Sequence, residues 1–257
     1  MSVDKDIKNI LEYLSGEEHN LLVSLHNLKD EVDWLYRFDK AWQDNLSKVK
    51  VSGKRFLMMR MLCNDCHVRF YVCFASLFRA RLAEYYSAMR RSIDGTLHAY
   101  REYEDKGYCE KYLVETPGSE VITNKRYIQD KRKSDPSRFT LADSLLQYFD
   151  AFSSGGPHAD PGGISIGHYT EEASAKGIPY SYFQVIDKLQ LRFWYFIALA
   201  NYLQMYKVFD LYSKEQNVIV MAEQQKEIED LTKRIENYVN SEEFKIRLKD
   251  SFERKSN

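Results

Sequence analysis

Residues that break helices are scarce in this chain, and many of those present are concentrated in one short region. The 257 residues include only 5 Pro and 11 Gly, and five of the glycines lie between residues 155 and 167. Helix interiors tolerate Pro and Gly least of all residues, so long stretches of this chain can remain helical. With 44% hydrophobic and 29% charged residues, such helices can bury an apolar face in a common core. The sequence therefore predicts an all-α fold: a long-helix bundle with one Gly-rich loop and a charged helical segment at the C-terminal end.

The N-terminal region has apolar residues at alternating spacings of three and four. Ser15 followed by Glu18 forms a capping box that predicts a helix start, and the residues VSGK at 51–54 predict its end. A 3.5-residue repeat of this length places one stripe of side chains against a neighbouring helix. The only position of the repeat without an apolar residue is Asp39. It consists of Leu21, Leu25, Leu28, Val32, Leu35, Trp42, Leu46 and Val49.

Between Arg55 and Tyr103 the chain contains no Pro and a single glycine, Gly95. This region predicts either one very long helix or two stacked helices. Amphipathic patterns predict further helices over residues 140–152 and roughly 182–212. The expected core residues of the Arg55–Tyr103 region are Leu57, Met61, Val68, Val72, Leu77, Leu82 and Ile93.

From about Ser213 the sequence predicts a charged helix in which acidic and basic residues balance. Its apolar residues form a near-heptad stripe, so the helix either folds back on the bundle or pairs with a second chain. The sequence favours a helical bundle domain of residues 1–212, followed by a coiled-coil-like appendage of residues 213–257. The stripe consists of Val218, Met221, Ile228, Leu231, Ile235 and Tyr238.

The balance of charge argues against a general binder of nucleic acids or anionic membranes. The formal net charge is −1, so the long-range attraction of a strongly basic protein is missing. The longest apolar run, residues 193–206, is shorter than the roughly 20 residues that cross a bilayer, and it predicts a buried helix. Residues 1–20 contain no uninterrupted apolar segment, so no signal peptide is expected. We therefore expect a cytoplasmic protein with no membrane association.

The stretch CNDCHVRFYVC, residues 63–73, begins with the Cys-x-x-Cys-His spacing that attaches a c-type haem. Haem c is attached outside the bacterial cytoplasm, which this chain is not expected to leave. Zinc is the alternative, because Cys63, Cys66 and His67 share one helix face, but no second Cys/His pair completes a site. Free cysteines often pack as small hydrophobic residues. We expect Cys63, Cys66 and Cys73 to be packing residues with His67 as their neighbour, and no metal or cofactor to bind here.

Two residues of the segment MRRSIDGTLHAYREYE, Arg91 and His98, are candidate catalytic residues. Six residues separate them, which meets the loosest form of the Arg-x4-6-His motif of HEPN ribonucleases, helical proteins in which the two side chains act together at a dimer interface. His would act there as general acid or base, while Arg stabilises the charge of the transition state. Residues seven apart also share a helix face, so a packed, hydrogen-bonded pair is the alternative.

The Gly-rich passage SSGGPHADPGGISIGHY offers a candidate ligand site. His158, Asp160 and His168 can form a set of metal ligands, and adjacent glycines can turn backbone N–H groups toward an anion. No Lys follows the glycines and no strand precedes them, so the passage matches no phosphate-binding loop. The alternative is a structured connection in which His158 or Asp160 binds the end of a flanking helix.

Basic residues outnumber acidic ones between Lys54 and Arg101, where arginines alternate with aromatic residues. Such a face can contact RNA, with Arg on phosphates and aromatic rings on bases. The alternative is that this helix packs beside the acidic N-terminal helix, whose Asp30, Glu31, Asp33, Asp39 and Asp44 would pair with it. The arginines are Arg69, Arg79, Arg81, Arg90 and Arg91.

Two segments, MRRSIDGTLHAYREYEDKGYCEKYLVE and LLQYFDAFSSGGPHADPGG, together resemble a group of uncharacterised bacterial helical proteins. The resemblance covers roughly residues 55–170. It departs from the group's pattern at Asp94, where Glu is usual, and at Asp160, where Asn is usual. The group is similar to HEPN-like domains in its helical arrangement, and the resemblance implies no established activity and no residue role.

These observations support three hypotheses. The leading one is an interaction or scaffolding protein that forms a homodimer or binds a protein partner, with the stripes at residues 21–49 and 218–238 as candidate interfaces. The second is a HEPN-like protein that binds or cleaves RNA through Arg91 and His98. The third is a metal or small-ligand site at His158, Asp160 and His168.

Overall fold

The computed structural model describes residues 10–114, 123–154 and 188–246. Within these ranges every regular element is an α-helix, which confirms the predicted all-α fold. The helices are α1 (Ile10–Asn27), α2 (Lys29–Leu46), α3 (Gly53–Phe78), α4 (Leu82–Glu104), α5 (Tyr108–Tyr112), α6 (Thr123–Ser134), α7 (Ala142–Ser154), α9 (Lys188–Glu215) and α10 (Ala222–Val239).

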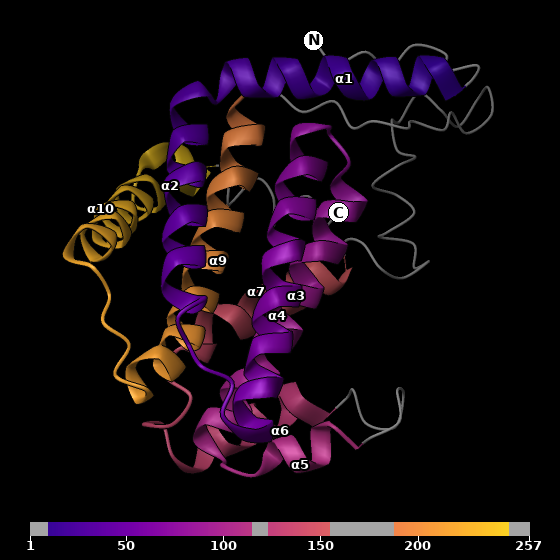
Figure 1. The fold of residues 1–257 in the computed structure, drawn as a ribbon. Coiled ribbons are helices and arrows are strands. Elements are labelled where there is room, and N and C mark those ends of the chain that lie inside the picture. Colours follow the sequence, from indigo (N-terminus) through magenta and orange to yellow (C-terminus); the bar gives the residue numbers. More distant parts are fainter. Residues whose placement is uncertain (1–9, 115–122, 155–187, 247–257) are drawn as a thin grey trace, which may run out of the picture.

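Helices α2, α3, α4 and α9 form the body of the protein (Figure 1). Helix α1 crosses one end of this body, while α5 and α6 lie at the other end. Helix α7 packs against α4 and α9, and α10 packs against α2 and α9. The Arg55–Tyr103 region is thus two packed helices, which was one of the two arrangements predicted for it.

Helix α9 is the central helix, because it contacts α2, α3, α4, α7 and α10. Its rings meet those of α3 at angles typical of aromatic pairs: Tyr202 lies 5.2 Å from Phe70 and Tyr195 lies 5.4 Å from Phe74, centroid to centroid. Most of residues 193–206 are buried, which confirms that this apolar run is a buried helix. None of the described helices combines the length and apolarity that crossing a bilayer requires.

The N-terminal region is two helices, and its predicted start at Ser15 is wrong. Ser15 lies inside α1, and the chain bends at Leu28, whose backbone angles are not helical (φ −115°, ψ 32°). The bend lets α1 cross the end of the body with Gly16, Asn20 and Ser24 facing inward. Asn20 donates its side-chain N–H to the carbonyl of Arg79 (3.5 Å), just beyond the C-terminal end of α3. A straight continuation of α2 would not make this contact.

Four of the seven core residues expected for the Arg55–Tyr103 region are instead partly exposed on α3. The exposed fractions of Leu57, Met61, Val68 and Val72 range from 38% to 54%. The buried side of α3 carries Phe56, Met59, Cys63, Cys66, Phe70, Cys73 and Phe74. Because this side offers larger aromatic surfaces to α4 and α9, it buries more apolar area than the opposite side. The other three expected core residues, Leu77, Leu82 and Ile93, are buried.

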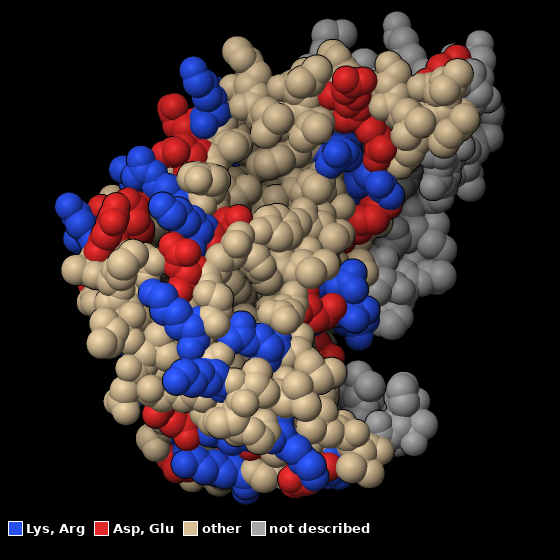
Figure 2. All heavy atoms as spheres, in the orientation of Figure 1, with Lys and Arg blue, Asp and Glu red and all other residues tan. Residues whose placement is uncertain are grey.

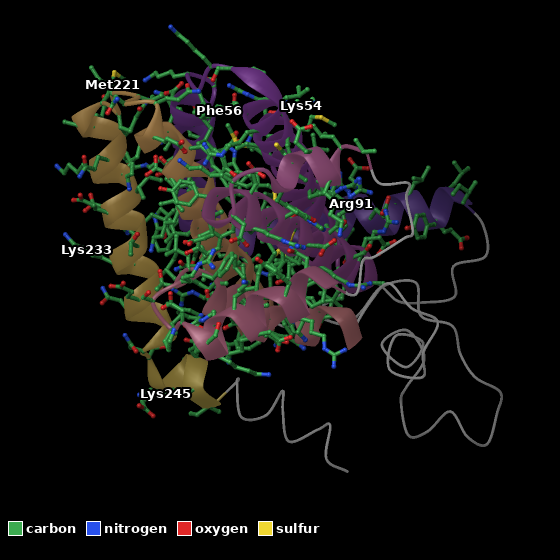
Figure 3. All side chains as sticks on the ribbon, turned by 90° about the horizontal axis from the view of Figure 1, so that it is seen from below. Lys54, Phe56, Arg91, Met221, Lys233 and Lys245 are labelled. Carbon is green, nitrogen blue, oxygen red and sulfur yellow. The ribbon has the colours of Figure 1, made fainter. Side chains whose placement is uncertain are left out.

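Helix α10 folds back on the body of the same chain. Leu231, Ile235 and Tyr238 are buried, and the Tyr238 ring stacks on Phe196 of α9 with centroids 4.0 Å apart. Figure 3 shows α10 along one edge of the protein, with Met221 at one of its ends. The stripe at residues 218–238 therefore packs within the chain in this structure.

The stripe at residues 21–49 is also used within the chain. Trp42, Leu46 and Val49 are buried, and α2 contacts both α9 and α10. Polar contacts join the same helices, since Gln224 donates to Asp44 (2.9 Å) and the guanidinium of Arg234 lies 4.7 Å from the Trp34 ring. Neither of the two stripes proposed as dimer interfaces presents its whole apolar face to solvent.

Candidate functional site

The cysteines of the stretch at residues 63–73 are packing residues, as predicted. Cys63, Cys66 and Cys73 are free thiols with at most 3% of their surface exposed. Burial raises the pKa of all three, and that of Cys66 to about 12. The Cys66 thiol donates to the carbonyl of Ser92 (3.1 Å). All three cysteines lie in the hydrophobic core, where a thiol packs as a small apolar side chain.

Among the described residues, no three His, Cys, Asp or Glu side chains gather closely enough to hold a metal ion. His67, the histidine of the haem-like motif, turns away from the cysteines toward α2. Its Nε2 lies 2.6 Å from Oδ1 of Asp39, and its ring stacks on Trp42 with centroids 5.7 Å apart. His158, Asp160 and His168, the candidate ligands of the Gly-rich loop, lie outside the described residues.

Arg91 and His98 lie on α4 but have different partners. The guanidinium of Arg91 binds both carboxylate oxygens of Asp65 on α3, at 3.0 and 3.3 Å. Nδ1 of His98 is hydrogen-bonded to the hydroxyl of Tyr108 (2.8 Å), and the two rings stack. No hydrogen bond or ion pair joins Arg91 to His98 in the described part of the chain, so the alternative of a hydrogen-bonded pair of these two side chains is wrong.

His98 is held neutral by its surroundings. Only 14% of its side chain is exposed, and this burial lowers the pKa of His98 although Asp94, 4.0 Å from its Nε2, opposes the shift. Burial likewise raises the pKa of Asp94, against the attraction of His98 and Arg90. Both shifts favour the uncharged forms of the two side chains.

Replacing His98 with Gln is expected to flatten the dependence of stability on pH. An unfolded chain has a histidine pKa near about 6.5, so as pH falls through that value the unfolded state binds a proton that folded His98 resists. The free energy of unfolding should therefore decrease between about pH 7.5 and about pH 5.5 in the wild type, and less steeply in the variant. Urea unfolding across this range measures both slopes. An unchanged slope in His98→Gln would contradict the assignment.

The arginines of the basic region are largely paired, but not with the expected acids of α2. Arg81 pairs with Glu17 of α1 (3.0 Å) and with Glu84 (2.5 Å). Asp65 on α3 pairs with both Arg69 (3.6 Å) and Arg91. The α2 acids have other partners, such as Arg192 for Glu31 and Arg37 for Asp33. In the folded chain these arginines therefore form ion pairs with acidic residues of α1, α3 and α4.

The outward side of α3 forms an exposed, mainly apolar surface. We call it the α3 outer stripe; it consists of Leu57, Met61, Asn64, Val68, Tyr71 and Val72, and its apolar members are 38% to 54% exposed. The first five follow one another at spacings of four, three, four and three residues, the 3.5-residue repeat of helices that pair with other helices. From these fractions we estimate an exposed apolar area on the order of 400 Å², comparable with the largest patch on a typical monomer, which is often functional.

Charged and polar side chains border the α3 outer stripe on both sides. Figure 2 shows an uncharged area in the upper middle of this face, with a basic group below it and Lys, Arg, Asp and Glu along its edges. Asp65 and Arg91 form the border next to α4. On the α2 side, Asp39 accepts hydrogen bonds from Tyr71 (2.9 Å) and binds His67.

The α2 border is a network that fixes the edge of the stripe. Gln43 donates to both Asp39 (3.1 Å) and the Tyr71 hydroxyl (3.0 Å). Burial, reinforced by the neighbouring Asp39 carboxylate, raises the pKa of Tyr71 to about 12. Asp39 is also the acidic residue that interrupts the apolar stripe at residues 21–49. The interruption is explained by its hydrogen bonds to His67 and Tyr71.

A groove of about 550 Å³ lies between the C-terminal half of α9 and α10. Its charged lining consists of Lys207, Lys214 and Lys233 together with Asp210, Glu229 and Glu236. Acidic and basic residues are equal in number, and Lys214 pairs with Asp210 (2.9 Å). The lining therefore has no net charge with which to select an ionic ligand.

The fold and this surface define an all-α helical-bundle protein with an exposed apolar helix face. Comparison with protein-family models, with curated proteins and with solved structures finds no match to the chain. The resemblance to HEPN-like helical proteins stays a prediction.

Proposed function

We propose that this protein is a cytoplasmic interaction or scaffolding module that binds a partner through the α3 outer stripe. The observation that supports the proposal best is that four large apolar side chains, with Val72 beside them, are exposed at heptad-like spacing on a helix whose other side belongs to the core. An apolar centre with a charged border is the usual anatomy of a protein interface.

The support for this surface includes its rigidity. Phe70 and Phe74, on the buried side of α3, pack against aromatic rings of α9, so the outward side has a fixed shape before a partner arrives. Binding to such a surface needs little ordering of the protein, which reduces the entropic cost of association. A helix presenting its own apolar side chains to the stripe matches the 3.5-residue repeat.

The contacts of His98 make the ribonuclease hypothesis less favourable. In that hypothesis two copies would bring Arg91 and His98 into one solvated cleft. His98 is mostly buried and hydrogen-bonded to Tyr108, and Arg91 is bound to Asp65. Arg91 would have to leave Asp65, and the mostly buried His98 ring would have to become accessible, before the two could act on RNA.

A photo-crosslinking amino acid in place of Met61 tests the proposal. In cells that express the protein, irradiation is expected to give one discrete covalent adduct, because a bound partner excludes water and lies against this position. The same amino acid in place of Ile219, which is 85% exposed in the connection between α9 and α10, is the control and should give no discrete adduct. Gel electrophoresis and mass spectrometry read the result. If position 61 reacts no more specifically than position 219, the proposal is wrong.

A further inference from the structure

We infer that the partner covering the α3 outer stripe is a second copy of this chain, so that the protein is a twofold symmetric dimer through α3. This inference rests on the proposed function and names its partner. Neither of the two sequence stripes first considered as interfaces is free for this role, because α2 and α10 pack on each other and on α9. We therefore place the interface on α3 and not on either of these stripes.

The size of the surface supports a second copy. From Leu57 to Val72 the stripe rises by about 22 Å along the helix axis. An apolar area on the order of 400 Å² on each of two chains gives about 800 Å² in total, and the borders from α2 and α4 add to it. Stable dimers bury about 1,200–2,000 Å² in total. Because homodimer interfaces are about 65% apolar, 800 Å² of apolar area corresponds to about 1,200 Å² in total, the lower end of this range.

The residue pattern of the stripe suits pairing with itself. A twofold interface must be its own complement, since the same patch contributes from both chains. The stripe has bulky apolar residues toward both ends, Leu57 and Met61 on one side and Val68 and Tyr71 on the other, with Asn64 midway. This arrangement looks similar from either end, so both parallel and antiparallel pairing bring apolar residues together.

Asn64 is the polar residue that a second copy satisfies. It is exposed, and its side chain makes no hydrogen bond within the described ranges of the chain. An Asn side chain has both donors and an acceptor, so two copies can bond to each other across a twofold axis. A single Asn among apolar positions is also the device that fixes register in paired helices. An unrelated apolar partner would leave this amide without a hydrogen bond.

Electrostatics permits the pairing of identical surfaces. The formal net charge of −1 gives little long-range repulsion between copies. The borders contain both signs, with Asp65 between Arg69 and Arg91 on one side and Asp39 on the other. Two such faces can exchange ion pairs at their edges.

The molar mass of the purified full-length chain tests the inference. Light scattering at micromolar concentrations is expected to give twice the chain mass of 30.4 kDa for the wild type. The double variant Met61→Lys, Val68→Lys should dimerise about 100-fold more weakly or worse, because two lysines on each chain would be buried without partners. A matched control, Ile219→Lys with Ile246→Lys, changes two exposed apolar residues elsewhere and should remain dimeric. Circular dichroism and thermal unfolding check that all three proteins fold.

Cross-linking provides an independent measurement that does not depend on a destabilising charge. Asn64→Cys should form a disulfide between chains under mild oxidation, since residue 64 lies near the twofold axis in either direction of pairing. The four native cysteines are buried and should not compete. A wild type that is monomeric, or a dimer that tolerates both lysines and gives no cross-link at residue 64, would overturn the inference.

The two proposals fail in different ways. A monomeric wild type whose residue 61 crosslinks to a different protein in cells would refute the second copy but keep the interaction module. A monomeric wild type with no discrete adduct at residue 61 would refute both.

Discussion

Replacing Glu102 with Ala is expected to lower the free energy of unfolding by about 3–5 kcal/mol, the usual cost of breaking a buried ion pair from one side. Glu102 is fully buried on α4. Its carboxylate accepts the backbone N–H groups of Gly107 (3.2 Å) and Cys109 (2.5 Å), and it lies 3.4 Å from Nε of Arg55. Without it, a mostly buried guanidinium keeps only part of its countercharge, and two N–H groups at the start of α5 lose their acceptor.

Urea unfolding measures this loss, with a nearby glutamate as control. Glu110 pairs with Lys54 at the surface, where both side chains are about 60% exposed, so Glu110→Ala should be far less destabilising than Glu102→Ala. Glu102→Gln retains one acceptor oxygen and should fall between the two. If Glu102→Ala is no more destabilising than Glu110→Ala, the carboxylate does not hold the turn between α4 and α5.

Replacing Phe70 with Ala is expected to cost about 3–5 kcal/mol, as for other large buried aromatic residues. Phe70 is 2% exposed, and its ring lies 5.7 Å from Phe38 of α2, 5.1 Å from Phe74 of α3 and 5.2 Å from Tyr202 of α9. The cavity left by its removal would therefore weaken the contacts among three helices at once.

The control for Phe70→Ala is an exposed apolar residue. Leu22 on α1 is 61% exposed, so Leu22→Ala should change the free energy of unfolding by less than about 0.5 kcal/mol. Denaturant unfolding followed by circular dichroism gives both values. Equal losses in the two variants would mean that Phe70 is not at the centre of the core.

The helical class and the central helix could be predicted from local features of the sequence. The scarcity of Pro and Gly leaves few places where a helix must end. The apolar run at residues 193–206 has no polar side wide enough for solvent, so it had to be buried. The packing role of Cys63, Cys66 and Cys73 followed from the missing second pair of metal ligands.

The orientation of α3 could not be predicted from periodicity. Both sides of this helix are apolar, so the spacing identifies two stripes without deciding which one faces the core. The decision depends on the rings of α9 that meet Phe70 and Phe74, and α9 is remote in the sequence. As a result the residues expected in the core include the most exposed apolar residues of α3, which form the candidate site.

The bend at Leu28 and the partners of Arg91 and His98 depend on tertiary contacts in the same way. No Pro or Gly marks the bend, which accompanies the contact of α1 with the turn after α3. The spacing of Arg91 and His98 allowed a packed, hydrogen-bonded pair of the two, but Arg91 binds Asp65 and His98 binds Tyr108. Spacing along a helix tells which residues share one side of it. It does not tell which residue of another helix lies against that side.

The central position of α9 has a consequence for the synthesis of this protein. Chains emerge from the ribosome with the N-terminus first, and domains fold as units. Helices α3 and α4 are complete well before residues 188–215 are made, yet these residues cover the aromatic side of both. Nascent chains that stall before α9 should therefore carry uncovered aromatic surface and depend on chaperones until translation reaches that helix.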